Sequence, residues 1–444
     1  MLRERLFIRE LEKIGVIVEK QGKDLVLTHV PNTWFGVFEI PKGITKIDEK
    51  AFDGCKDVSS VIVPNSVTSI GNSAFANCEG LEWINIPNSV KDIGNSAFAN
   101  CKSLKKIQIP DSVNNLGWNV FDGCVSLRQA EVGDGIAHIG LDTFKDCKQL
   151  ETIVLPKNLE TIVSGAFEGC TSLKQLDIPD GVTFIGYKAF FGCERLIEIR
   201  IPSGVHKLGE SAFQGCFNLK KVEIGDGVTG IGDHAFQDCR SLTQINIPNS
   251  VTAIGYGAFT HCSDLTEIKI PKSVERINRS FMGCSSLERI IVEEGNPVYY
   301  SGNWNAIIDK SGELVAGCKG TVIPDGIVTS IGEGAFYGHQ RLTKIVIPDS
   351  VTAIKPYAFG KITRLKDVEI PRNVRYLGGF CFAGCSRLKS VTLYGKTLYD
   401  DTCFSRCDAL SEINSPREAE NVSDKKEETK DVSCYKALQE ERSI

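Results

Sequence analysis

Cysteine and histidine are the side chains of this chain best suited to metal binding or nucleophilic catalysis, and the sequence has 17 cysteines and 6 histidines. Thirteen of the cysteines recur at one position of a repeated unit. Two copies of the unit carry His339 and Ile362 there instead. Because an isoleucine can take this position, we expect a small apolar pocket that holds buried free thiols. Disulfides are the less favoured alternative, since a column of parallel side chains lacks the dihedral angle that a disulfide requires.

Two short motifs are the nearest candidates for a metal site. Cys381 and Cys385 lie in the sequence CFAGC, and Cys403 and Cys407 lie in CFSRC one repeat later. Four thiols in adjacent coils could surround zinc, but zinc-binding cysteines usually have two residues between them, not three. Cys381 and Cys403 also occupy a position that alanine fills in other copies. We therefore expect small buried side chains here and no metal.

The histidines offer no catalytic arrangement. They are His29, His138, His206, His234, His261 and His339, and none lies in an HExxH motif. The chain also has no P-loop, no GxSxG motif and no GxGxxG that opens a helix after a strand. Identical coils present identical residues, so a catalytic cluster would have to interrupt the repeat. We expect no enzymatic activity, no catalytic residues and no cofactor.

The repeat itself is clearest in its phenylalanines. Most of them follow one another at steps of 22 or 23 residues, and one step, from Phe281 to Phe336, is 55 residues long. The series is Phe52, Phe75, Phe98, Phe121, Phe144, Phe167, Phe190, Phe213, Phe236, Phe259, Phe281, Phe336, Phe359, Phe382 and Phe404. A period between about 20 and 29 residues with leucine and isoleucine at fixed offsets is typical of a leucine-rich repeat solenoid.

One unit, residues 64–86, shows how each coil would fold. Leu81, Ile84 and Ile86 alternate with polar residues, which predicts a short strand with one buried face. Gly71 predicts a corner where a side chain would crowd the next coil. Phe75 and its neighbours have a nearly helical spacing, which predicts a short helical turn with the ring pointing inward. No coil could bury these apolar residues alone, so neighbouring coils must stack.

These residues resemble the BspA-like, or Treponema pallidum-type, leucine-rich repeat family. The pattern I-P-x-x-V-T-x-I-G-x-x-A-F-x-x-C-x-x-L-x-x-I-x runs through residues 40–414. We expect a right-handed, β-rich coil with a parallel sheet on its concave face and short helical turns. The family includes bacterial surface proteins that bind host matrix proteins or other cells, so the resemblance implies a role in macromolecular binding or adhesion.

The breaks in the pattern predict the domain organisation. Residues 1–39 are expected to form a helix and hairpin that cap the first coil, with Phe7, Leu11 and Ile14 on one helical face. Residues 40–414 would form a solenoid of about fifteen 23-residue units. A hairpin insertion is expected at about residues 293–322, where two apolar segments flank a turn. Residues 415–444 are polar and charged, which predicts a disordered tail.

Charge and hydropathy exclude several classes of partner. The net charge is −5 and the chain has no dense Lys/Arg tract, so we expect no nucleic-acid binding. The chain has no run of about 18 consecutive apolar residues, so we expect no membrane span. The charged N-terminal segment does not resemble an export signal, which indicates a cytoplasmic location. The family resemblance implies the cell surface or secretion instead, and both alternatives stay open here.

The outward positions of the predicted strands are the main candidate for a binding surface, because a solenoid usually places its specificity on such a face. Their residues are polar and of both signs, whereas the flanking positions vary little. They are Trp83, Asn85, Lys106, Gln108, Gln129, Glu131, Gln175, Asp177, Glu198, Arg200, Lys221, Glu223, Gln244, Asn246, Glu267 and Lys269. Solvation alone is the alternative explanation. In the insertion, Tyr299, Tyr300 and Trp304 are candidates for an exposed aromatic patch, or else fill a distorted core.

Taken together, these features predict a non-catalytic, monomeric scaffold that binds a protein or another macromolecule through the concave repeat face. Adhesion is the role that the family resemblance implies. An intracellular adaptor is the alternative, which the predicted free thiols favour because reducing compartments keep cysteines unpaired.

Overall fold

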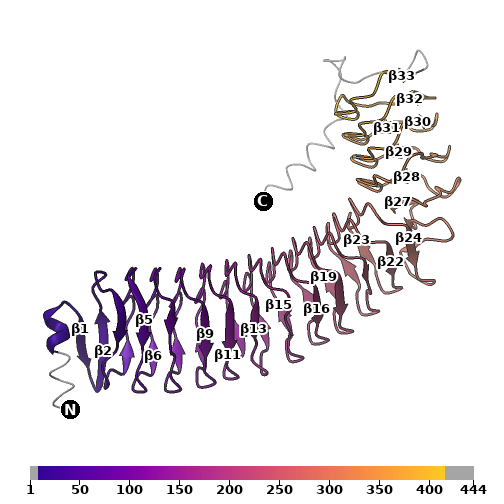
Figure 1. Ribbon diagram of the computed structural model, residues 1–444. Helices are drawn as coiled ribbons and strands as arrows, with labels where there is room; N and C mark the ends of the chain where they lie inside the picture. Colours follow the sequence, from indigo (N-terminus) through magenta and orange to yellow (C-terminus); the bar gives the residue numbers. More distant parts are fainter. Residues whose placement is uncertain (1–8, 416–444) are drawn as a thin grey trace. The chain divides into compact units, whose positions relative to one another are not determined.

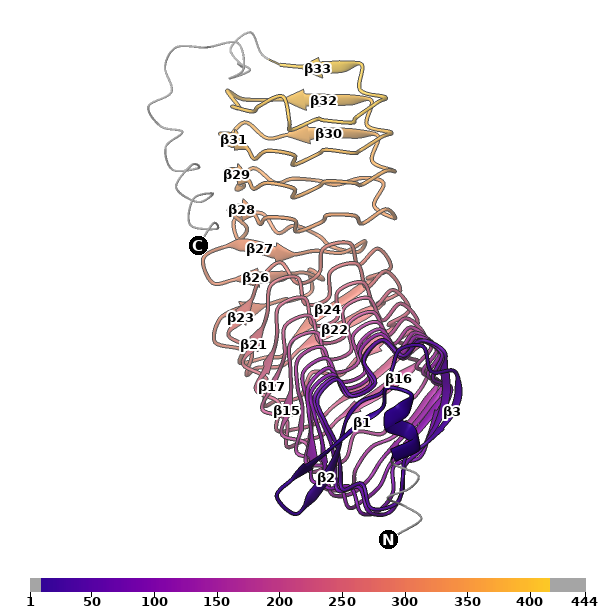
Figure 2. The same cartoon turned by 90° about the vertical axis from the view of Figure 1, so that its left-hand side faces the viewer.

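The computed structural model describes residues 9–415, which form two compact units, residues 9–298 and 299–415. The boundary falls inside the predicted insertion. Both units are β-solenoids in which short strands of successive coils pair in parallel (Figures 1 and 2). This confirms the predicted fold class. The predicted tail, residues 415–444, lies outside the described residues except for its first residue, and so does Phe7.

The first unit has one ladder formed by the strands of the Leu-x-x-Ile segments, here called the first ladder. Each strand pairs in parallel with the equivalent strand of the next coil, with interruptions that divide the ladder into several short sheets. Its strands are β3 (Gly36–Glu39), β5 (Val58–Ile62), β7 (Trp83–Ile84), β9 (Lys106–Ile109), β11 (Gln129–Val132), β13 (Thr152–Val154), β16 (Glu198–Ile201), β18 (Lys221–Ile224), β20 (Gln244–Ile245), β22 (Glu267–Ile270) and β24 (Arg289–Val292).

The second ladder of this unit is formed by the Val-Thr-x-Ile segments. It begins with an antiparallel hairpin, β1 with β2, as the sequence predicts for residues 16–30. Its strands are β1 (Ile17–Gln21), β2 (Asp24–His29), β4 (Lys46–Ile47), β6 (Ser69–Ile70), β8 (Asp92–Ile93), β10 (Asn115–Leu116), β12 (His138–Ile139), β14 (Thr161–Ile162), β15 (Phe184–Ile185), β17 (Lys207–Leu208), β19 (Gly230–Ile231), β21 (Ala253–Ile254) and β23 (Arg276–Ile277).

The second unit starts with three antiparallel strands and then continues as parallel ladders. β26 and β27 form the predicted hairpin of the insertion, and β27 then pairs in parallel with the next coil. The strands are β25 (Tyr299–Tyr300), β26 (Ile307–Asp309), β27 (Glu313–Ala316), β28 (Ser330–Ile331), β29 (Ala353–Ile354), β30 (Asp367–Ile370), β31 (Tyr376–Leu377), β32 (Ser390–Leu393) and β33 (Glu412–Asn414).

A continuous stack of phenylalanine rings fills the interior of each unit. The rings of Phe190 and Phe213 lie 5.0 Å apart between centroids, and those of Phe213 and Phe236 lie 5.5 Å apart, with nearly parallel planes. All three side chains are fully buried. Offset stacking at this distance is favourable for aromatic pairs. The predicted ladder of phenylalanines is therefore confirmed.

The segment around each phenylalanine consists of consecutive hydrogen-bonded turns where the sequence predicts a helical turn. Ala76 N donates to Ser73 O, and Cys78 N donates to Phe75 O, so each bond spans three residues. Ser73 and Asn77 have φ angles of 51° and 58°. Left-handed residues on both sides of Phe75 interrupt helical geometry. A short helix does occur at residues 9–13, where Leu11 is buried and Ile14 is exposed.

Candidate functional site

The predicted binding surface lies on the outward face of the first ladder. Of its sixteen side chains, fourteen are exposed, and Asn85 and Glu267 are partly buried. In β16 and β18 each exposed residue alternates with a buried one. The parallel register places Glu198 beside Lys221 and Arg200 beside Glu223. The regular backbone therefore lines up side chains of opposite charge in neighbouring coils.

Ion pairs organise part of this surface. Lys221 Nζ lies 2.5 Å from Glu223 Oε1, and Lys269 Nζ lies 2.6 Å from Glu293 Oε1. The hydrogen bond to Glu223 raises the pKa of Lys221, and the same bond lowers the pKa of Glu223. Both side chains are exposed, so solvent screens their attraction. These pairs fix the orientation of side chains and contribute little to stability.

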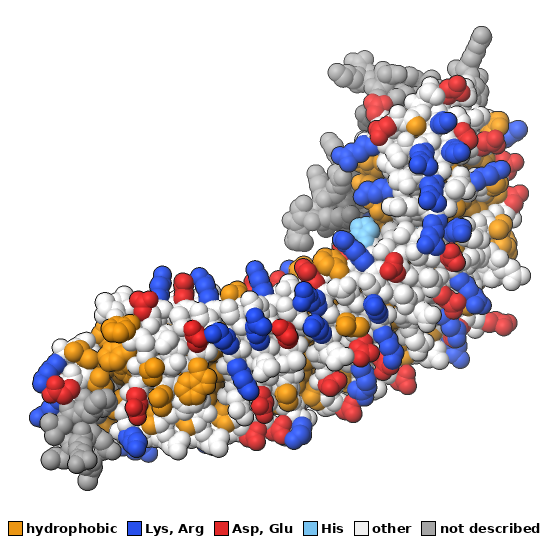
Figure 3. Space-filling view, in the orientation of Figure 1, with side chains coloured by type: hydrophobic (Ala, Val, Ile, Leu, Met, Phe, Trp, Pro, Cys, Tyr) orange, Lys and Arg blue, Asp and Glu red, His pale blue; other side chains and the backbone are white. Residues whose placement is uncertain are grey.

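The first ladder is hollowed where its pairing is interrupted. Residues 173–179 form no strand, so the ladder stops beside β16. A hollow of about 270 Å³ lies here. Six of its lining side chains belong to the predicted surface: Gln175, Asp177, Glu198, Arg200, Lys221 and Glu223. Charged side chains of both signs are interspersed on the face of the first unit that Figure 3 shows.

Asn85 differs from the other predicted surface residues because its amide binds the backbone. Asn85 Nδ2 donates to Val63 O and Asn85 Oδ1 accepts from Val63 N, both at 2.8 Å. The amide thus extends the contact between the two coils beyond the pairing of β5 with β7, which covers Ser60 with Trp83 and Val61 with Ile84. This contact gives Asn85 a structural role. Trp83 on the same strand segment is 48% exposed and remains available to a partner.

Sequence reasoning left out other residues at equivalent positions. Val154 is 61% exposed at the end of β13, and Val346 of the second unit is 68% exposed. In the second unit a hollow of about 700 Å³ is lined by Val346, Glu369 and Tyr394, among others. The offsets of the repeat place both residues at the outward position of the strand. They were left out because the prediction was based mainly on polar side chains.

The candidate aromatic patch of the insertion requires a correction. Tyr299 is only 7% exposed, and Tyr300 and Trp304 are partly buried against the core of the second unit. The rings of Tyr300 and Trp304 meet edge to face, 6.1 Å apart between centroids. The short antiparallel strands leave space that these rings fill. The structure thus favours the alternative that the aromatic side chains complete a distorted core.

The cysteine ladder is a structural element of the core. All sixteen cysteines between residues 9 and 415 are free and buried. Most thiols donate a hydrogen bond to a phenylalanine carbonyl of the preceding coil, as Cys216 Sγ does to Phe190 O at 3.3 Å. Burial raises the pKa of the Cys216 thiol well above its usual range. A thiol in this position is protonated at neutral pH and is a poor nucleophile.

The four thiols of the candidate metal motifs do not converge. The sulfur atoms of Cys381 and Cys403 lie 2.9 Å apart. Cys385 and Cys407 each donate to a phenylalanine carbonyl instead. Within residues 9–415, no three His, Cys, Asp or Glu side chains are grouped in a way that could hold a metal ion. The described part of the chain also has no helix that is long and apolar enough to span a membrane.

Stacked coils with two parallel ladders and an inner stack of phenylalanines define a β-solenoid of the leucine-rich repeat class. The chain belongs to the BspA-type leucine-rich repeat family. The family described as "BspA type Leucine rich repeat region (6 copies)" matches residues 32–151, 71–197, 137–255, 207–303 and 318–426. No curated protein matches the sequence.

Solved structures of bacterial leucine-rich repeat proteins are similar to the chain. A leucine-rich repeat protein from Bacteroides ovatus is 25% identical, with 90% of this chain and 98% of that chain covered and a TM-score of 0.52. A leucine-rich cell surface protein from Faecalibacterium prausnitzii is 22% identical, with 90% and 94% covered and a TM-score of 0.39. The leucine-rich repeat protein of Treponema pallidum is 23% identical, with 56% and 87% covered and a TM-score of 0.26.

Proposed function

We propose that this protein is a non-catalytic scaffold that binds a protein partner through the outward face of the first ladder. The observation that carries the proposal is the set of exposed, oppositely charged side chains aligned over a hollow in β16 and β18. A repeat protein typically binds with such an extended surface, on which the backbone is constant and the side chains vary. Complementary charges across an interface favour specificity and fast association.

A more specific proposal is a role in adhesion, which rests on the family. The family includes bacterial surface proteins, so this resemblance implies a role at the cell surface. The intracellular adaptor is the second candidate, because sixteen buried free thiols suit a reducing compartment. Fractionation of the native cells distinguishes the two: protein found only in the cytosol excludes adhesion.

A pull-down with charge-reversed variants tests the binding surface. The immobilised protein would be exposed to cytosol and, separately, to matrix proteins. We expect a partner that wild type retains and that Arg200→Glu with Lys221→Glu loses, because both positive side chains lie in the hollow. Lys207→Glu is the control, since Lys207 is also exposed but lies on the second ladder. Retention of the same proteins by wild type, the double variant and the control would contradict the proposal.

A further inference from the structure

The second ladder of the first unit is interrupted between β10 and β12. β8 pairs with β10, and β12 pairs with β14, but β10 and β12 belong to different sheets. In the preceding coil Gly117 N donates to Ile93 O at 2.8 Å. The equivalent bond from Gly140 N to Leu116 O is not formed within residues 9–415. Backbone donors and acceptors are therefore open at this point of an otherwise regular ladder.

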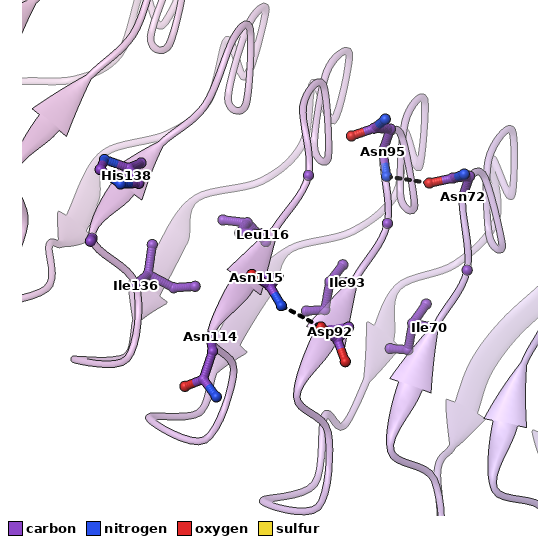
Figure 4. A pocket seen from close by; sticks show the side chains of 14 residues that line it. Ile70, Asn72, Asp92, Ile93, Asn95, Asn114, Asn115, Leu116, Ile136 and His138 are labelled. Carbon is purple, nitrogen blue, oxygen red and sulfur yellow. Dashed lines mark hydrogen bonds between the residues drawn. The ribbon is translucent and has the colours of Figure 1, made fainter.

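A shallow trough of about 610 Å³ lies at the interruption (Figure 4). It extends over the outer faces of β6, β8, β10 and β12. Its polar side chains are Asn72, Asp92, Asn95, Asn114, Asn115 and His138. All six are exposed. The trough is thus rich in hydrogen-bonding groups and open to a ligand.

Several amides in the trough keep free hydrogen-bonding capacity. Asn72 Oδ1 accepts from Asn95 N at 2.9 Å, and Asn95 Oδ1 accepts from Trp118 N at 2.8 Å. These bonds hold both side chains in place while their NH₂ groups have no partner in the described part of the chain. The side chain of Asn114 makes no hydrogen bond there either. Fixed amides with unused donors are suited to binding hydroxyl groups.

Trp118 directly follows Gly117, one of the residues that line the trough. Its side chain is 59% exposed, although indole is largely apolar. A Cβ placed on Gly140 would lie 2.8 Å from Trp118 Cδ1, so the ring lies close to Gly140, the residue that follows β12. An exposed aromatic ring beside polar groups offers both an apolar face and a wet edge to a ligand.

The charge of the trough indicates the class of ligand. Asp92 is the only charged residue among those that line it. No lysine or arginine is present to bind a phosphate or another anion. One carboxylate among amides is also a poor site for a divalent cation. The ligand should be neutral and rich in hydroxyl groups, with an apolar face that can pack on an indole ring.

We propose that this trough binds a neutral oligosaccharide. Asn114, Asn72 and Asn95 would donate hydrogen bonds to its hydroxyl groups, and Asp92 would accept one. Trp118 would pack against the C–H face of a sugar ring. An extended neutral peptide, which could pair with the open backbone groups, is the competing ligand that the experiment must exclude.

Calorimetric titration of the full chain tests this proposal. The probes are maltotetraose, cellotetraose, mannotetraose and N-acetylated chitotetraose, with a neutral eight-residue peptide for comparison. We expect at least one tetrasaccharide to bind with a dissociation constant below about 1 mM. Asn114→Ala and Trp118→Ala should each weaken that binding about tenfold, since each removes a direct contact.

Tyr187→Ala is the matched control, because Tyr187 occupies the position of Trp118 three coils later and is 45% exposed. It should leave the affinity unchanged. The side chain of Asn114 makes no hydrogen bond within residues 9–415, so Asn114→Ala reports on the site even if Trp118→Ala proves unstable. Three results would overturn the proposal: no tetrasaccharide binds, only the peptide binds, or Asn114→Ala binds the sugar as wild type does.

Discussion

Position 339 shows what a single residue contributes to the core. His339 takes the place that cysteine holds in most coils, and it is 2% exposed. Its Nδ1 has no hydrogen-bond partner within residues 9–415. Burial lowers the pKa of His339 to about 4, because the charged imidazolium would lose its hydration. The folded state therefore holds this side chain in its neutral form.

We predict that His339 makes the protein sensitive to acid. The folded pKa is lower than the unfolded value of about 6.5, so the stability is complete above pH 6.5 and falls as the pH drops towards 4. The loss should reach up to about 3 kcal/mol, at about 1.4 kcal/mol per pKa unit. Urea unfolding at pH 7 and pH 4.5 measures it, and His339→Cys should remove this part of the dependence.

Carboxylates also titrate in this range, so the comparison needs a control. The carboxylates are the same in wild type and in His339→Cys, so the difference between the two pH dependences isolates the contribution of His339. If wild type and His339→Cys lost equal stability between the two pH values, the neutral state of His339 would not matter to folding.

Single residues are also where the sequence predicts most reliably. The burial of Phe213 and Cys216 follows from a period that repeats their surroundings at every coil. For Tyr299 the sequence left exposure and burial open, because its burial depends on how the antiparallel strands of the insertion pack. Asn85 looked like a surface residue, and nothing in its own coil indicates that its amide would bind Val63 one coil earlier.

At the scale of elements, the corner after each second-ladder strand depends on close approach between coils. A Cβ on Gly209 would overlap the backbone of Gly186 and lie 2.8 Å from Tyr187 N. Gly230 lies in β19, where a Cβ would meet only Lys207 Cγ at 3.6 Å. Gly230 lies in the coil that follows that of Gly209, yet only Gly209 is required by the packing of neighbouring coils.

We predict opposite effects for alanine at these two glycines. Gly209→Ala should destabilise the protein by about 1–3 kcal/mol, because backbone atoms of the preceding coil must move. Gly230→Ala should be neutral or stabilise by up to about 1 kcal/mol, because it restricts the unfolded chain. The next coil already carries Ala253 at this position. Denaturant midpoints decide the matter, and equal losses would mean that the corner tolerates a side chain.

The elements also show the limits of the sequence pattern. The alternation of apolar and polar residues predicts the strands, and the turn residues between apolar segments predict both hairpins. The sequence predicts a helical turn around Phe75, because a helical turn and the consecutive turns observed here have the same spacing of apolar residues. What excludes a helix is the left-handed conformation of Ser73 and Asn77, for which serine has no strong preference. The trough beside Trp118 was also missed, because it depends on the missing pairing between β10 and β12.

At the scale of the whole molecule, each coil has an inner side that stabilises the fold and an outer side that is exposed and can bind a partner. In a solenoid each coil contacts only its neighbours, so a defect weakens one coil and its two interfaces. The inner side is represented by Phe213 between Phe190 and Phe236. The outer side is represented by Glu198 and Lys221, which are adjacent in the first ladder.

The most direct test of this division compares the denaturation curves of Phe213→Ala and of a Glu198→Ala, Lys221→Ala double variant. Phe213→Ala should cost about 3–5 kcal/mol through lost burial and the cavity left behind, and should split the cooperative transition. The double variant should lose less than about 1 kcal/mol, because it removes only exposed side chains and one exposed ion pair. Equal losses in the two variants would contradict the assignment of the two sides.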